Sequence, residues 1–348
     1  MAKYALLSLL VLTLFAGCSK DSGGTPATSG KPDQKPVPTE GTTAQKPGQM
    51  PAQKPGQNRV VTSVSHAAFS GEHAFTFLTA QTAFGPRNPN SAGHRACLAY
   101  LVSTLRGLAD DVRLQEFTHN GYGGEQLRLT NIVASFRPKD PARILLCAHW
   151  DTRPRAEQDE TREKRNDPIL GANDGASGVA VLMEIAGLLK SIPPSIGVDI
   201  VLFDGEDYGR EGDHASYLLG SRYFAGHKER DYLPRFGILL DMVGDKFLEL
   251  PKERYSLRYA PDIVDMVWRT AALLGAQQFH DENGEEIMDD HLPLNEAGIQ
   301  TIDIIDFNYP DTTNRFWHTH QDTPEHCSAE SLGAVGTVIA SVVYAQVP

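Results

Sequence analysis

The sequence predicts an α/β domain with a mostly parallel central sheet, helices on both faces and antiparallel strands at one edge. Continuous apolar runs alternate with helical patterns through residues 59–348, as they do in βαβ units. Acids and histidines recur where the apolar runs end, which is the edge where open α/β sheets carry their chemistry. Residues 143–178 show both features, because an apolar run ends in His149 and a glycine-rich loop with Asp174 precedes a helical pattern.

Each expected element follows from the spacing of its apolar residues. Two N-terminal segments have helical spacing, and the next two alternate like antiparallel strands. Four continuous apolar runs are typical of parallel strands buried on both faces. In chain order we expect helices over 73–83 and 92–109, strands over 112–118, 127–136 and 144–148, a helix over 177–189, a strand over 198–203, a helix over 218–227, a strand over 236–240, a helix over 261–274, a strand over 301–305 and a helix over 329–344.

The chain begins with a segment typical of export. Residues 1–17 contain Lys3, a short apolar run and two small residues before Cys18. The run is shorter than the roughly 20 apolar residues that a membrane-spanning helix needs. The segment resembles a bacterial lipoprotein signal, which implies cleavage, a lipid on Cys18 and an exported protein anchored to the periplasmic or extracytoplasmic face of a bacterial membrane. An ordinary cleaved signal peptide is the alternative.

Composition separates a tether from a folded domain. Residues 18–58 are rich in proline, glutamine, glycine, threonine and lysine without apolar periodicity, which is typical of a disordered linker. Residues 59–348 are long enough for one large catalytic domain, which we expect to be monomeric. The formal net charge of −12 argues against nucleic acid as a partner, and the Cys18 lipid is the only membrane contact we expect. The other three cysteines, an odd number, predict no complete disulfide framework.

Candidate catalytic side chains follow the predicted strands. Because parallel strands share one direction, their carboxyl ends bring these side chains into one cleft. Carboxylate oxygens and histidine nitrogens are zinc ligands, and closely spaced carboxylates repel one another unless a cation neutralises them. The sequence therefore predicts a metal. The candidates are, in chain order, His149, Asp174, Glu206, Asp207, Asp241 and His318.

Each candidate alone has a simpler interpretation. Asp174 fits a helix N-cap, Glu206 and Asp207 fit a solvated turn, and Asp241 fits a turn cap. His318 fits an ordinary core or surface histidine. Their recurrence at the ends of successive buried strands favours the metal site over these separate interpretations.

Six ordered motifs resemble those of a known family. The chain resembles the zinc aminopeptidase superfamily and, within it, the glutaminyl-peptide cyclotransferases of the animal and bacterial zinc type. The resemblance runs from about residue 69 to residue 347. The motifs are His149-Trp-Asp-Thr-Arg-Pro, Gly171-Ala-Asn-Asp-Gly-Ala-Ser-Gly, Phe203-Asp-Gly-Glu-Asp, Leu240-Asp-Met-Val-Gly, Asp289-Asp-His-Leu-Pro-Leu and Phe316-Trp-His-Thr.

The resemblance implies a ligand set. In the cyclases one zinc ion is held by residues matching Asp174, Asp207 and His318, and the acid matching Glu206 is catalytic. In the aminopeptidases of the superfamily, two zinc ions are held, and the acid matching Glu206 activates water. The residues matching the two-zinc set are His149, Asp174, Asp207, Asp241 and His318. This chain keeps every position, so the number of ligands does not separate the two branches.

Three features favour the cyclase branch. Asp289 matches the cyclase acid that pairs with the acid matching Asp241, and such pairing would take Asp241 away from a second metal. Trp317 matches the tryptophan that walls the glutamine pocket, and Leu-Gly-Ser-Arg at 219–222 resembles a Tyr-Gly-Ser-Arg run. A helix N-cap for Asp289 and plain core packing for Trp317 are the alternatives.

Three positions depart from the cyclase pattern. Gly212 falls where a second pocket tryptophan is expected, so Tyr208 or Tyr217 would have to form that wall, or the pocket is wider. Asp207 replaces a glutamate ligand, and its shorter side chain would shift the metal. Asp303 stands where the animal enzymes carry a histidine, which puts the hydrogen-bonding role of that position in doubt.

We therefore expect a zinc-dependent glutaminyl-peptide cyclotransferase, an acyltransferase that converts the N-terminal glutamine of peptides and proteins into pyroglutamate and releases ammonia. Zinc would polarise the side-chain amide, and Glu206 would shuttle the proton. Asp289 and Asp241 would orient the reacting groups, and Trp317 and Tyr208 would bind the substrate. The alternative is a two-zinc aminopeptidase that hydrolyses N-terminal residues, and a third hypothesis is a non-catalytic binding domain.

Overall fold

The structure, a computed structural model, describes residues 68–210 and 212–348. The predicted signal peptide, Cys18 and the tether lie outside the described residues, so those predictions stand as predictions.

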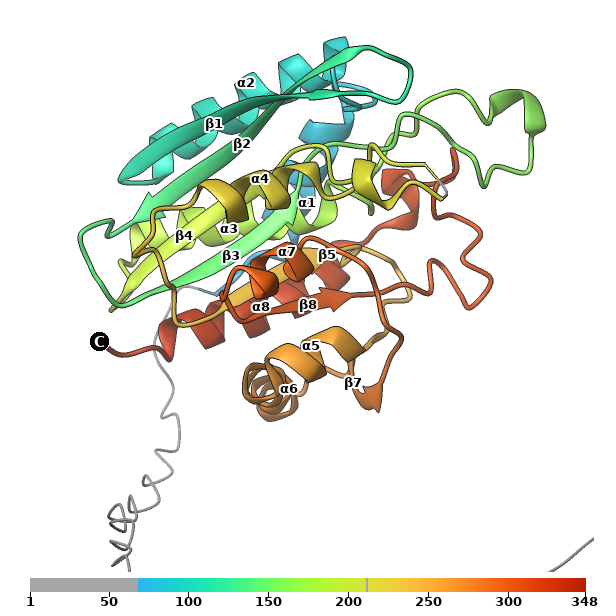
Figure 1. The fold of residues 1–348 in the computed structure, drawn as a ribbon. Helices are drawn as coiled ribbons and strands as arrows, with labels where there is room; N and C mark the ends of the chain where they lie inside the picture. The colour runs from blue at the N-terminus through green and yellow to red at the C-terminus, as the bar shows by residue number, and fades with distance from the viewer. Residues whose placement is uncertain (1–67, 211) are drawn as a thin grey trace, which may run out of the picture. The chain divides into compact units, whose positions relative to one another are not determined.

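A six-stranded sheet forms the centre of the described domain (Figure 1). Its strand order is β1-β2-β4-β3-β5-β8, and β1 with β2 and β2 with β4 are antiparallel, whereas the remaining pairs are parallel. The predicted mixed sheet with an antiparallel edge is confirmed. A separate small sheet pairs β6 with β7. The strands are β1 (Asp111–Asn120), β2 (Gln126–Phe136), β3 (Arg143–His149), β4 (Gly197–Phe203), β5 (Gly237–Asp241), β6 (Leu250–Lys252), β7 (Phe279–Asn283) and β8 (Thr301–Ile305).

Helices cover both faces of the sheet. Helix α3 packs against β3, β4 and β5, with α1, α2 and α8 around it, whereas α4 and α7 pack together over the opposite face. The α-helices are α1 (Gly71–Thr82), α2 (Ala92–Leu108), α3 (Ser177–Ser191), α4 (Leu219–His227), α5 (Arg254–Tyr259), α6 (Pro261–Leu274), α7 (His291–Glu296) and α8 (Ala329–Tyr344). Short 3₁₀ turns lie at Arg162–Lys164, His214–Ser216 and Pro324–His326.

Helix α3 is buried along most of its length because it lies between the sheet and other helices. Gly178, in its first turn, makes this close approach possible. A Cβ atom there would lie 2.1 Å from the backbone oxygen of Leu240 in β5. The glycine therefore lets the start of α3, which follows the loop containing Asp174, sit directly against the sheet.

The twelve elements expected from the sequence all form, and their ends differ from expectation by a few residues at most. The strand expected over 236–240 begins one residue later and includes Asp241. Four short elements were not expected: α5, α7, β6 and β7. Each spans six residues or fewer, too few for an apolar period to stand out.

The three cysteines in the described ranges, Cys97, Cys147 and Cys327, are buried and unpaired. In the same ranges no helix combines the length and the apolar character that crossing a membrane requires.

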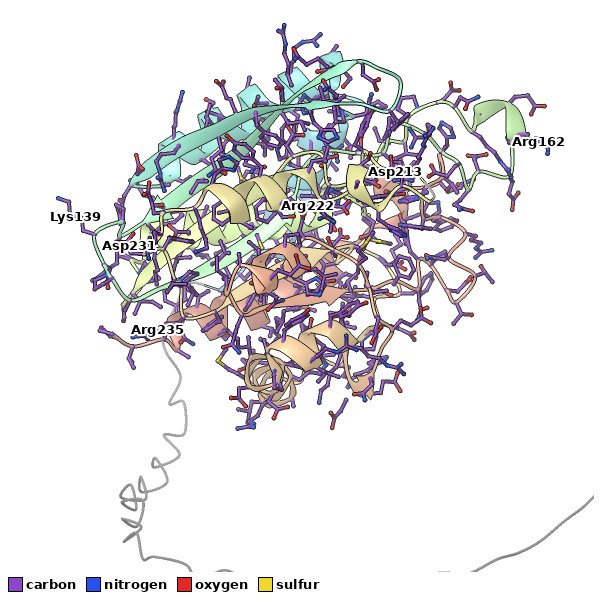
Figure 2. The ribbon with its side chains drawn as sticks, viewed as in Figure 1. Lys139, Arg162, Asp213, Arg222, Asp231 and Arg235 are labelled. Atoms are coloured by element: carbon purple, nitrogen blue, oxygen red, sulfur yellow. The ribbon has the colours of Figure 1, made fainter. Side chains whose placement is uncertain are left out.

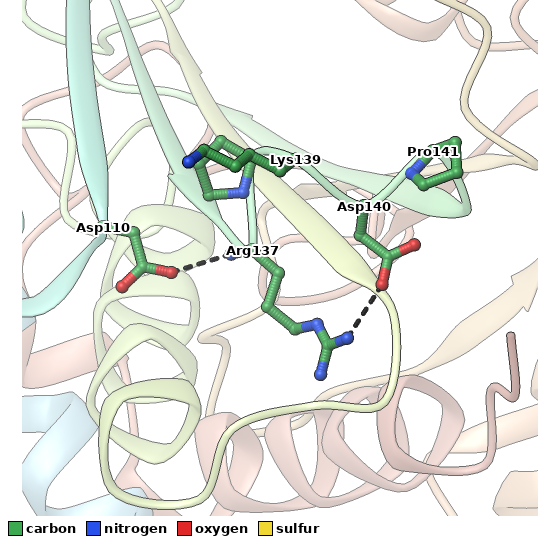
Figure 3. Close-up of a pocket in the computed structure, with 6 residues that line it drawn as sticks. Asp110, Arg137, Lys139, Asp140 and Pro141 are labelled. Carbon is green, nitrogen blue, oxygen red and sulfur yellow. Dashed lines mark hydrogen bonds and ion pairs between the residues drawn. The ribbon is translucent and has the colours of Figure 1, made fainter.

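A surface hollow lies at the amino end of β3, away from the predicted site (Figure 3). It is lined by Asp110 and by the turn at residues 137–141, whose side chains are mostly exposed. The backbone amide of Arg137 donates to Asp110 Oδ2 at 2.8 Å, and its side chain donates to Asp140 Oδ2 at 3.0 Å. Figure 2 shows Lys139 of this turn and Arg162, in the loop beyond β3, at opposite ends of the domain.

Candidate metal and active site

The carboxyl ends of the central strands carry the predicted ligands. β3 ends at His149, β5 ends at Asp241, and Asp207 follows β4 by four residues, and all three side chains are buried. His318 lies in the loop between β8 and α8 with a φ of 55°, a left-handed value that costs a residue other than glycine roughly 1–3 kcal/mol. Such strain is held by the surrounding structure and clusters at functional sites.

Asp174, Asp207 and His318 form one candidate metal-binding group. Ligand atoms of the three residues all lie within 4.8 Å of one another. His318 Nε2 is 3.6 Å from Asp174 Oδ2 and 3.4 Å from Asp207 Oδ1. The structure thus brings together the three residues that the cyclase resemblance implies.

His149, Asp174 and Asp241 form a second candidate group. His149 Nε2 is 3.2 Å from Asp174 Oδ1 and 3.1 Å from Asp241 Oδ1. Asp174 therefore offers one carboxylate oxygen to each group. All five ligands that the two-zinc alternative needs also converge.

The donor set fits zinc. Buried oxygen and nitrogen ligands suit this ion, and Asp207 Oδ2 is a buried acceptor with no hydrogen-bond partner in the structure. Burial and the neighbouring carboxylate of Asp207 raise the pKa of Asp174, because closely spaced acids repel one another unless a cation neutralises them. Burial opposes ionisation of Asp207 as well, but Arg153 and His318 hold its pKa well below the usual range.

The loop that carries Asp174 is held by a buried aspartate that the sequence analysis did not single out. Asp322 Oδ1 accepts from the Asn173 amide at 2.7 Å and from the Tyr309 hydroxyl at 3.0 Å, and Oδ2 accepts from the Asp174 amide at 3.2 Å. Helix α3 begins after Ala176 without a side-chain cap. The N-cap interpretation of Asp174 is therefore wrong, and its carboxylate is free to serve the metal site.

Glu206 lies beside the ligand group on a turn fixed by another acid. The carboxylate of Asp151 accepts from the backbone amide of Glu206 at 3.1 Å and from that of Asp207 at 3.3 Å. Burial raises the pKa of Glu206 well above its usual range, His149 opposes this rise, and the nearby acids Asp207 and Asp289 add to it. A carboxylate with a raised pKa suits proton transfer near neutral pH.

Asp289 and Asp241 lie close together, but their hydrogen bonds run to other groups. Asp241 Oδ1 contacts His149, whereas Asp289 Oδ1 accepts from the backbone amide of Asp290 at 2.5 Å. Burial and the neighbouring carboxylate of Asp241 raise the pKa of Asp289 well above its usual range. Both carboxylate oxygens of Asp303, which stands in place of the histidine of the animal enzymes, are buried and have no hydrogen-bond partner in the structure. Asp290, not Asp289, stands at the start of α7 and provides no side-chain cap, so the cap interpretation of Asp289 fails.

The aromatic candidates lie in different surroundings. Trp317 is partly exposed, stacks on His318 with ring centroids 3.6 Å apart and packs edge-on against Phe307, as a wall beside the metal group would. Tyr208 is buried in a separate apolar cluster, and its hydroxyl donates to Glu125. Tyr217 is partly exposed and lies nearer the ligands, because its hydroxyl accepts from Arg153, which contacts Asp207. The substrate-binding roles of these residues stay predictions.

The fold and the two ligand groups are those of a zinc-dependent exopeptidase-like enzyme. Residues 131–343 match the model of peptidase family M28, and the chain belongs to that family.

Among solved structures, the chain is similar to a Bacteroides thetaiotaomicron glutaminyl cyclase bound to N-acetylhistamine, at 41% identity and a TM-score of 0.77 over 81% of this chain and 99% of that one. It is also similar to a leucine aminopeptidase precursor from the same species, at 42% identity and a TM-score of 0.78 over 82% and 100%. Aminopeptidase YwaD of Bacillus subtilis is 31% identical over 225 residues, 62% of this chain. The match covers 44% of YwaD, so this chain spans less than half the length of that relative.

Proposed function

We propose that this chain is a glutaminyl-peptide cyclotransferase that uses one zinc ion, held by Asp174, Asp207 and His318. The observation that carries this choice is the cluster of buried acids beside Asp241, in which Asp289 Oδ2 and both carboxylate oxygens of Asp303 have no hydrogen-bond partner in the structure. Burial and the neighbouring carboxylates raise the pKa values of Asp289 and Asp303 well above the usual range, so bound protons reduce the repulsion in this half of the site without a second ion. The similarity to a solved glutaminyl cyclase is compatible with this choice, although the chain is equally similar to a solved leucine aminopeptidase precursor.

In this proposal zinc supplies a Lewis acid that polarises the γ-carbonyl of an N-terminal glutamine. Glu206 accepts a proton from the α-ammonium group, and the freed amine attacks the carbonyl carbon of the side-chain amide to close a five-membered ring, while the second proton of the attacking nitrogen passes to solvent. Glu206 then delivers a proton to the amide nitrogen, the carbon–nitrogen bond breaks, and ammonia leaves. Because both reacting groups belong to one residue, positioning supplies much of the rate.

The remaining side chains position the substrate and exclude water. Asp289, a buried acid beside Asp241, orients the amine and the leaving amide together with Asp241. Trp317 stacks on His318 and presents a partly exposed indole face beside the metal group. Exclusion of water there favours ring closure over hydrolysis of the side-chain amide.

The second candidate is a two-zinc aminopeptidase. The specific observation in its favour is that His149 and Asp241 converge on the second oxygen of Asp174, as a second metal would require. In that case Glu206 would serve as the base for water attack on the first peptide bond.

Mass spectrometry of a glutamine-first peptide incubated with the zinc-loaded enzyme tests the proposal. Loss of ammonia with every peptide bond intact is the expected result. A peptide shortened from its N-terminus would establish the aminopeptidase instead, and an unchanged peptide would favour a binding domain. We further propose that the enzyme is exported, is held at a bacterial membrane through a lipid on Cys18, and acts as a monomer on peptide N-termini.

A further inference from the structure

Arg153 is a buried arginine to which the mechanism above gives no role. It follows β3 in the loop that leads to Asp174, and its side chain is 1% exposed. Its Nη1 donates to Asp207 Oδ1 at 2.6 Å and to the backbone oxygen of Asp207 at 3.2 Å. The guanidinium therefore holds this ligand by its side chain and by its main chain.

The other edge of the same guanidinium holds Glu157. Nε of Arg153 donates to Glu157 Oε1 at 2.7 Å, and Nη2 donates to the same oxygen. Nη2 also donates to the hydroxyl of Tyr217 at 2.7 Å. Every nitrogen of the guanidinium thus has a partner, and its plane is fixed on both sides.

Glu157 faces His318 with hydrogen-bonding capacity to spare. Glu157 Oε1 is 3.9 Å from His318 Nδ1, and both His318 Nδ1 and Glu157 Oε2 are buried atoms with no hydrogen-bond partner in the structure. A histidine that ligates a metal through one ring nitrogen usually donates its other N–H to a carboxylate or carbonyl oxygen. A small rotation of the Glu157 carboxylate provides that acceptor.

We propose that Arg153 and Glu157 are positioning residues that tie Asp207 to His318 behind the metal. The path Asp207–Arg153–Glu157–His318 joins two of the three zinc ligands without touching the ion. Arg153 offsets the charge of one ligand, and Glu157 orients the imidazole of the other so that Nε2 faces the metal. This inference rests on the assignment of zinc to Asp174, Asp207 and His318 under the proposed function.

The same contacts explain how a ligand one methylene shorter than glutamate can serve at position 207. Arg153 occupies Oδ1 of Asp207, which leaves Oδ2 as the buried oxygen without a hydrogen-bond partner. The guanidinium therefore fixes the orientation of the carboxylate through Oδ1, the oxygen that lies 3.4 Å from His318 Nε2.

The test is the zinc dissociation constant of Arg153→Lys and Glu157→Gln, measured by competition with a chromophoric chelator in the absence of substrate. Each variant should bind zinc roughly 10- to 100-fold more weakly, the usual cost of losing a partner of a metal ligand. The loss of zinc affinity in the double variant should be smaller than the product of the two single losses, because both substitutions act through the same hydrogen-bonded path. Arg258→Lys is the matched control, because Arg258 pairs with Glu286 on the surface. This variant should bind zinc with the affinity of the parent protein.

Unchanged zinc affinity in both variants would overturn the inference. Thermal melting of the zinc-free proteins identifies a merely structural role. If the residues act only on the fold, the substitutions would lower the melting temperature and leave zinc affinity unchanged. That result would also count against the proposal. If Arg153→Lys does not fold, Glu157→Gln decides alone, because Glu157 is 27% exposed and the change preserves its shape. Since no substrate is used, an aminopeptidase product from the parent enzyme would contradict the proposed reaction and leave this result intact.

Discussion

The two ligand groups share Asp174 but neutralise their charges in different ways. In the His318 group, the guanidinium of Arg153 donates to Asp207 and places a permanent positive charge beside this acid. The His149 group lies next to further buried acids, and burial and neighbouring carboxylates raise the pKa values of Asp289 and Asp303 well above the usual range there. One half of the site therefore relies on a guanidinium that stays charged at any working pH, and the other relies on protons held by acids with raised pKa values.

This difference shows why a second candidate ligand group does not imply a second ion. A metal ion binds most tightly where the ligands are already ionised and held in place, so that no proton has to be displaced. Asp207 is held in this way by Arg153. Where a proton already reduces the repulsion, a metal must first displace it. We therefore expect the His318 group to bind zinc tightly and the His149 group to bind it weakly.

The largest effect is expected from removing a histidine from each group. His318→Ala should lose zinc and activity together, with a loss of affinity greater than the roughly 10- to 100-fold typical of outer partners. His149→Ala should keep about one zinc per chain, because its imidazole belongs to the other group. Elemental analysis of the two purified variants makes the measurement. Loss of zinc from both to the same extent would remove the distinction between the groups.

The second prediction concerns Glu206, which lies beside both groups but belongs to neither. Glu206→Gln keeps the shape of the side chain and removes the proton acceptor, so kcat should fall by about 10²- to 10⁴-fold. Zinc content should stay at the parent value. A variant with near-parental kcat would show that another group moves the proton.

The ligands of the site could be predicted from the sequence, whereas the residues that hold them could not. Strand ends can be located from apolar runs, so His149 and Asp241 are predictable as neighbours even though they are far apart in the chain. Asp174, Asp207 and His318 lie in loops after strands, where their motifs placed them.

The supporting residues depend on tertiary contacts that no local pattern encodes. Arg153 was visible in the sequence within the first motif, but its partners Asp207 and Glu157 depend on how two loops meet. Asp322 gives no local signal that it hydrogen-bonds the loop before α3. Tyr208, predicted at the substrate pocket, lies in its own apolar cluster because its hydroxyl pairs with Glu125 in the turn between β1 and β2.

The third prediction separates one zinc from two by changing acids of the His149 group. Asp241→Asn and Asp289→Asn should both leave zinc content at about one per chain, because neither residue serves the His318 group. Both should lower kcat, by roughly tenfold or more, through loss of orientation of the reacting groups. A fall from two zinc ions to one in Asp241→Asn would favour the aminopeptidase.

The smallest effect is expected from Glu253, a buried acid behind the His149 group. Glu253 caps α5 by accepting from the amides of Tyr255 and Ser256 at 2.7 and 2.6 Å, and it contacts His291. Burial opposes its ionisation, but these contacts lower its pKa to about 2. A carboxyl whose pKa is lower in the folded protein than in the unfolded chain stabilises the fold above about pH 4.5, and this contribution is lost as the pH falls toward 2.

Glu253→Gln should therefore lower the free energy of unfolding of the chelator-treated protein by about 1–3 kcal/mol at pH 7, since the NH2 group of glutamine would replace one of the two oxygens that accept from the backbone N–H groups. The difference from the parent should shrink as the pH is lowered below about 4.5, and urea denaturation at several pH values measures it. Glu286→Gln, at an exposed surface pair, is the control and should change little. Zinc affinity in Glu253→Gln should equal that of the parent, in contrast to Glu157→Gln. A large loss of zinc there would mean that the acids behind His149 support the bound metal as strongly as Arg153 does, and the two halves of the site would then be equivalent.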